Sequence, residues 1–172
     1  MLNLFFKVVD GLSWIASRLA ELSVVILIVA MVYEVVARYI FNAPTEWAFD
    51  IAYMSSGIMF LLGVAWVLRE DAHIRIDIVR NKMPERVKNI IEGVTYLLVL
   101  CPIFAALSQV ALHRAMRAWT TNEVEMVSPW APHMWPFYWA LAIGLVVFTL
   151  QFAAEGLRAF AGQRTGSKGA QA

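Results

Sequence analysis

The sequence predicts an all-α membrane protein with four transmembrane helices, an N-terminal amphipathic segment, and an interfacial segment between spans two and three. Residues 51–68 carry no charge, and a helix of this length extends ~27 Å, close to the hydrocarbon thickness of a bilayer. Hydrophobic residues make up 60% of the chain and charged residues only 16%, a composition typical of membrane proteins. The net charge of +1 provides no basic excess for binding nucleic acid.

The N-terminal residues 1–17 combine regularly spaced apolar side chains with polar ones. The apolar positions are Leu4, Phe5, Val8, Leu12 and Ile15. This spacing predicts an amphipathic helix at the membrane interface that leads into a first span over about 17–38. The apolar run that follows is long and has no clear small-residue cleavage site, so we interpret the segment as an uncleaved signal-anchor rather than a cleaved signal peptide.

Glu34 is an ionisable residue near the end of the first span, and two interpretations are open. It could carry a proton or bind a cation, because charged residues inside spans are often functional. It could instead pair with Arg38, which lies four residues further on the same helix face. Because Arg38 is only one helical turn away, we favour the Glu34–Arg38 ion pair over a role in proton or cation transport.

A turn at Asn42, Ala43 and Pro44 separates the first span from the second, expected over about 47–68. Thr45 or Asn42 could cap the second helix, and Trp47 would lie at the depth of the lipid headgroups.

Two acidic residues fall in the first turn of that second helix. Glu46 and Asp50 are a like-charge pair four residues apart, which is unfavourable unless a cation is near. We expect Arg38 to bridge Asp50 and to clamp spans one and two together at the outer surface. The alternative is three independently solvated charges, since exposed ion pairs contribute little.

The segment after Arg69 alternates charged residues with isoleucines. His73, Arg75 and Asp77 alternate with Ile74, Ile76 and Ile78. A lone strand has no partner here, so we interpret the stretch as an interfacial segment whose isoleucines face lipid or another subunit. A single histidine lacks a metal-ligand set, so the residue chemistry favours His73 as a solvated loop residue.

The third span is expected over about 90–116 and the fourth over about 134–157. The third contains Pro102 and could continue to Trp119, so it should be tilted, protrude, or bend at the proline. An aromatic belt marks the start of the fourth span: Trp130, Trp135, Tyr138 and Trp139. Residues 1–160 therefore form a single four-helix transmembrane domain, and residues 161–172 a flexible tail.

The distribution of basic residues predicts the orientation. With a cytoplasmic N-terminus, all but three of the 14 Lys and Arg residues lie on the cytoplasmic side. The exceptions are Arg38, Arg114 and Arg117. This positive-inside bias places both termini in the cytoplasm.

The sequence contains no pattern typical of an enzyme, so we expect no catalytic site, metal or cofactor. No two of His73, His113 and His133 have the spacing of a helical metal pair, and none lies well inside a span where a haem would need it. This also disfavours a membrane anchor for a redox enzyme. Cys101 is alone and can form no internal disulfide.

The ordered set ARYIFNAPTEW, Asp50, FLLGVAWVLR, HIRIDIV and Pro84 resembles the small permease subunit of tripartite ATP-independent periplasmic (TRAP) transporters. The likeness is close over about residues 30–90, and SPWAPHMWPF extends it to the fourth span. The family often has Glu where this chain has Asp50. The positions that match the family pattern are Arg38, Asn42, Pro44, Trp47, Asp50, Gly63, Arg69, His73 and Asp77.

The resemblance implies a scaffold subunit in the bacterial inner membrane. It implies two partners besides lipid: a large permease subunit that moves the solute along an ion gradient, and a periplasmic binding protein that delivers an organic acid or related solute. The matching residues would then hold the fold and the subunit interface rather than bind solute. The competing hypothesis is a self-sufficient homodimeric proton-coupled exporter that uses Glu34.

Overall fold

The computed structural model describes residues 2–69 and 85–161 of the protein. Within these ranges the regular structure is helical, apart from one isolated antiparallel bridge between Val124 and His133. Four helical stretches are long and apolar enough to cross a membrane, which confirms the predicted all-α fold class. The proposed interfacial segment and the C-terminal tail lie outside the described residues.

Helices α1 (Leu2–Tyr39) and α2 (Ala48–Arg69) form the first antiparallel hairpin. Helix α1 has 38 residues and is ~57 Å long, well beyond the ~30 Å of a hydrocarbon core. The N-terminal amphipathic segment continues into the first span without a break, so the two form one helix. Small side chains on α1, among them Ala16 and Ala20, allow α2 to pack closely.

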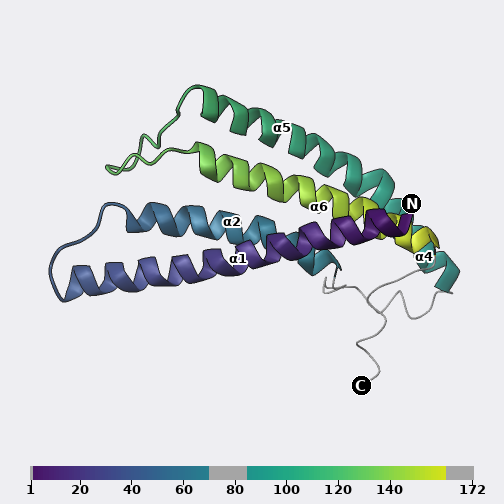
Figure 1. The fold of residues 1–172 in the computed structure, drawn as a ribbon, viewed down its shortest axis with the longest axis horizontal. Coiled ribbons are helices and arrows are strands. Elements are labelled where there is room, and N and C mark those ends of the chain that lie inside the picture. The colour runs from purple at the N-terminus through teal and green to yellow at the C-terminus, as the bar shows by residue number, and fades with distance from the viewer. Residues whose placement is uncertain (1, 70–84, 162–172) are drawn as a thin grey trace, which may run out of the picture.

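The third span is one helical stretch with an irregular middle. It consists of α4 (Glu85–Val94), a π-helical segment η1 (Thr95–Leu100) and α5 (Cys101–Thr120). Pro102 lacks a backbone N–H and its ring would crowd the carbonyl four residues earlier in a regular helix. The wider π turn lies directly before the proline, where the Cys101 N–H bonds the Tyr96 carbonyl. Figure 1 shows α4 set at an angle to α5, the bend expected at this proline.

Helix α6 (Trp135–Ala161) forms the second hairpin with α5, lies between α5 and the α1–α2 hairpin (Figure 1), and packs against the other described helices. Its aromatic residues Phe148 and Phe152 pack with Phe104 of α5 and with Leu62 and Leu68 of α2. Gly144 brings α6 very close to α2, because a Cβ at this position would stand 3.2 Å from the backbone of Leu61. The core of the bundle is therefore built around one face of α6.

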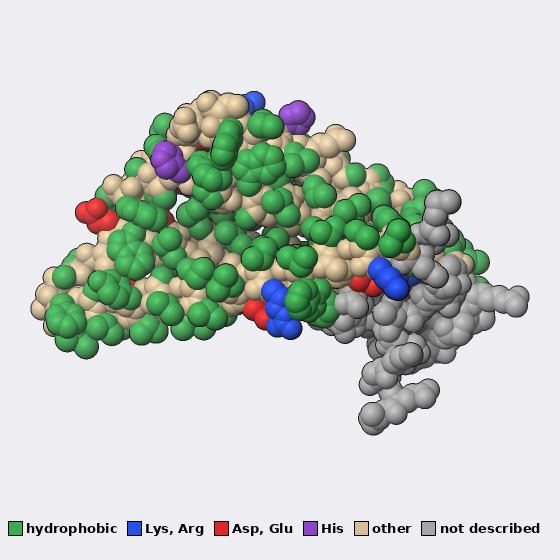
Figure 2. Space-filling model, in the orientation of Figure 1, with side chains coloured by type: hydrophobic (Ala, Val, Ile, Leu, Met, Phe, Trp, Pro, Cys, Tyr) green, Lys and Arg blue, Asp and Glu red, His purple; other side chains and the backbone are tan. Residues whose placement is uncertain are grey.

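The bundle has two distinct ends (Figure 1). One end, here called the loop end, carries the connections 40–47 and 121–134. The other, here called the terminal end, carries the start of α1, helix α4 and the end of α6. On the face shown in Figure 2, apolar side chains are spread along the described helices and far outnumber charged ones, as expected of helices that contact lipid or another membrane protein.

Candidate functional site

The turn between α1 and α2 is organised by the carboxylate of Glu34. One carboxylate oxygen accepts bonds from Arg38 Nε, at 2.8 Å, and from Arg38 Nη2. The other accepts bonds from the Thr45 backbone N–H, at 2.9 Å, and from the Thr45 hydroxyl. Glu34 is only 8% exposed, and both of its oxygens are occupied by partners within this hairpin.

The expected clamp between Arg38 and Asp50 is wrong. Arg38 pairs instead with Glu34, one turn earlier on α1, which is the pairing favoured from the sequence. Thr45 does not cap α2, because its hydroxyl and N–H both point back to Glu34. Helix α2 begins at Ala48, so Asp50 falls in its first turn and Glu46 precedes it.

Asp50 connects α2 to the other hairpin rather than to α1. Its carboxylate accepts a bond from the Ser128 hydroxyl, 78 residues away in the connection 121–134. The buried position of Asp50 at the first turn of α2 also suits the positive end of the helix dipole. This contact joins the two connections at the loop end.

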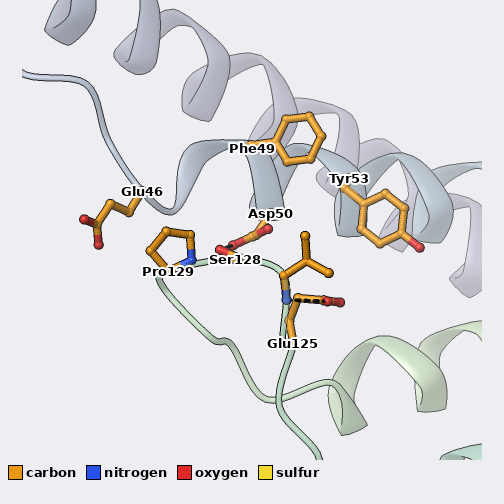
Figure 3. A pocket seen from close by; sticks show the side chains of 8 residues that line it. Glu46, Phe49, Asp50, Tyr53, Glu125, Ser128 and Pro129 are labelled. Carbon is orange, nitrogen blue, oxygen red and sulfur yellow. Dashed lines mark hydrogen bonds between the residues drawn. The ribbon is translucent and has the colours of Figure 1, made fainter.

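A cavity of about 350 Å³ opens beside this contact (Figure 3). Helix α2 provides one wall and the connection 121–134 the other, with Asp50 and Ser128 between them. Its lining combines three carboxylates with aromatic and aliphatic side chains: Glu46, Asp50, Glu125, Phe49, Tyr53, Val127, Ser128 and Pro129. Carboxylates beside aromatic rings accept the charged head and the apolar stem of a Lys or Arg side chain.

A second polar cluster fixes the connection 121–134 to α5 and α6. Arg114 donates to both oxygens of Glu123, at 2.6 Å for Nη1, and to the Tyr138 hydroxyl at 3.2 Å. The bonds from Arg114 hold the pKa of Glu123 below its usual value of 4.5. Trp119 and Trp135 meet edge to face nearby, with ring centroids 4.6 Å apart. The aromatic residues predicted to anchor the fourth span are therefore also part of the packing at the loop end.

The residues singled out from the sequence do not form one cluster. Asn42 occupies the left-handed region with φ of 49°, which the turn requires, and the neighbouring Pro44 is exposed. Trp47 packs against Tyr33 of α1, with ring centroids 5.5 Å apart. Gly63 lies in α2, where the nearest atom to an added Cβ is the Ala20 Cβ at 3.8 Å.

Three of the remaining candidates lie wholly or partly beyond what the structure describes. Arg69 is the last residue of α2, but the position of its side chain is outside the described part of the chain. His73 and Asp77 lie outside the described residues altogether. Their roles stay predictions.

Sequence reasoning missed the contacts that Thr45 and Ser128 make with Glu34 and Asp50. Each is a small polar residue whose hydrogen-bond partner depends on the fold. The nearest indication in the sequence was the presence of turn residues beside each of them. Within the described part of the chain, no three His, Cys, Asp or Glu side chains converge as metal ligands would. The loop end provides fastening contacts and a cavity lined by acidic and aromatic side chains.

Comparison with known proteins places this bundle among transporters. A segment of 74 residues is 27% identical to the sialic acid TRAP transporter permease protein SiaT of Haemophilus influenzae (strain 86-028NP). The segment covers 43% of this chain and only 12% of SiaT. No solved structure matches the chain. The model of the tripartite ATP-independent periplasmic transporters, DctQ component, matches residues 27–162, and the chain therefore belongs to this family of multi-pass membrane transport components.

Proposed function

We propose that the chain is the small scaffold subunit of a TRAP-type importer. It pairs with a large permease subunit and a periplasmic binding protein, and the complex takes up an organic acid or related solute along an ion gradient. Family membership supports this role. The large partner would carry the transport site, and this chain would enlarge the static part of the complex in the inner membrane.

The proposal rests on one observation: several polar side chains in the described part of the chain form hydrogen bonds with other parts of the same chain. Asp50 bonds Ser128, and Ser108 of α5 bonds Thr149 of α6 at 3.1 Å. Glu34 accepts bonds from Arg38 and Thr45. Each of these groups fastens one part of the chain to another, whereas a transport path needs polar atoms that are free to meet a solute.

The role of the Glu34 carboxylate distinguishes the scaffold hypothesis from the exporter hypothesis. A proton-coupled exporter would lose transport on Glu34→Gln even when the protein folds. In the scaffold, the same change weakens the α1–α2 turn and lowers the yield of the complex, but the complex that remains still transports. Uptake per assembled complex in proteoliposomes measures the difference, and Thr45→Val is the matched control because it removes a Glu34 contact without removing the charge.

The partners are tested by purification of the tagged chain from its native membrane in mild detergent. A large multi-span partner in equal amount supports the proposal, and a homodimer without such a partner would overturn it. We expect Trp47→Ala and His73→Ala to weaken assembly before they alter solute preference. A changed preference with intact assembly would contradict this.

We propose that the loop end faces the periplasm and meets the binding protein there, with both termini in the cytoplasm. The positive-inside distribution supports this orientation, since only Arg38, Arg114 and Arg117 would be periplasmic. The connection 121–134 exposes Met126 and Val127, each 91% exposed, beside the acidic cavity. Glu125→Lys should therefore reduce uptake most at low binding-protein concentration. An unchanged dependence on that concentration would contradict the contact.

A further inference from the structure

A chain of buried polar contacts joins α1 to α6 at the terminal end. The fully buried Ser13 hydroxyl donates to the Gln151 side chain at 2.9 Å, and Gln151 donates to Glu155 at 3.1 Å. Arg158 bonds the same oxygen of Glu155 and reaches Asp10 of α1 at 2.7 Å. These five side chains, Asp10, Ser13, Gln151, Glu155 and Arg158, are here called the terminal network.

The terminal network lies where α1 extends beyond α2. Gly63 faces Ala20, so the end of α2 at Arg69 reaches only to about the level of Ser13 on α1. The first turns of α1 then pack on α6, where Phe6 and Val9 meet Ala154 and the Arg158 guanidinium lies 4.8 Å from the Phe6 ring centroid. Residues 4–13 of α1, here called the leading segment, have α6 as a packing partner.

The leading segment turns a mixed face toward α6, formed by Phe6, Val9, Asp10 and Ser13, and leaves a second apolar stripe outside. Asp10 and Ser13 face α6, whereas Leu4 is 68% and Val8 54% exposed. Leu12 and Ile15 continue the exposed stripe. Leu4, Val8, Leu12 and Ile15, four of the apolar residues that predict an amphipathic helix at the membrane, are thus still free to contact lipid while the segment is docked.

This arrangement decides which contacts can hold the leading segment. Apolar side chains gain little by leaving lipid for a protein surface, because lipid tails are equally apolar. Buried polar and charged groups, by contrast, are costly when their partners are removed. We propose that the terminal network is the lock that docks the leading segment on α6, and that a chain without it stays in the membrane with this segment released.

The proposal is tested by cross-linking in membranes that contain the full chain. Cys101→Ala removes the native thiol, and Phe5→Cys with Leu157→Cys places one thiol on each helix within the same packing cluster. A short bismaleimide should join the pair efficiently in the otherwise unchanged chain. Arg158→Gln, and separately Asp10→Asn with Ser13→Ala, should lower the ratio of cross-linked to unlinked chain by about fivefold to thirtyfold, the factor by which a loss of about 1–2 kcal/mol lowers the ratio of docked to released segment.

Gly11→Ala is the matched control. An added Cβ there meets nothing within 4 Å and leaves every member of the network in place, so cross-linking should be kept. Equal cross-linking in the network variants, at equal amounts of membrane protein, would overturn the proposal. If Arg158→Gln does not accumulate, the milder Asp10→Asn with Ser13→Ala variant decides the question. The readout needs no transport, so it stands or falls separately from the proposed scaffold role.

Discussion

The close approach of α6 to α2 at Gly144 can be tested by one substitution made at two glycines. A Cβ at Gly144 would stand 3.2 Å from the Leu61 carbonyl carbon and oxygen, atoms of a helix backbone that cannot turn aside. A Cβ at Gly63 would meet the Ala20 Cβ at 3.8 Å, an ordinary contact. Replacing glycine by alanine favours either helix by about 1 kcal/mol, so this gain cancels when the two variants are compared.

The difference that remains is the cost of overpacking. Extra atoms in a well-packed interface cost about 1–3 kcal/mol, so Gly144→Ala should be less stable than Gly63→Ala by that amount. For a chain of this size the gap corresponds to roughly 2–12 °C in Tm. Thermal unfolding of the two variants in the same detergent, followed by size-exclusion chromatography, measures it. Equal Tm values, or a higher Tm for Gly144→Ala, would refute the close α2–α6 approach.

Three further predictions follow from polar contacts. Glu123→Gln should lower Tm at neutral pH, and the difference from the natural chain should vanish as pH falls through the lowered pKa of Glu123, because protonation removes the same charge. A double-mutant cycle of Ser108→Ala and Thr149→Val should give a coupling of about 0.6 kcal/mol, the usual size for such bonds between membrane helices. Glu34→Gln should lower the folded yield more than Thr45→Val, since only the former leaves a guanidinium without its carboxylate; equal yields would contradict this order.

The helices were predictable because each apolar run is long and its ends are charged or aromatic. The spans expected at 47–68 and 134–157 agree closely with Ala48–Arg69 and Trp135–Ala161. The start of α1 was harder, because an interfacial helix and an extended span share the same apolar spacing. Which of the two forms depends on contacts with α6, and those contacts join residues more than 100 positions apart.

The polar contacts at the loop end were predictable only where they are local. The Glu34–Arg38 pair follows from a spacing of four residues on one helix face. The Asp50 partner could not be found in this way, because Ser128 comes from the other hairpin. Arg38 is the nearest cation to Asp50 in sequence. Glu34, however, lies only one helical turn from Arg38 on the same helix, and Arg38 pairs with Glu34.

The placement of polar contacts gives a physical reason why this bundle suits a static role. Glu34 and Asp50 fasten the loop end, and the terminal network fastens the other. Between them α2 and α6 are held by close backbone approach at Gly144 and by aromatic packing around Phe148. A helix that slides during transport would have to break such bonds in each cycle, at a cost for every buried polar group left without a partner. A bundle fastened at both ends resists sliding, and this is the property that the proposed scaffold role requires.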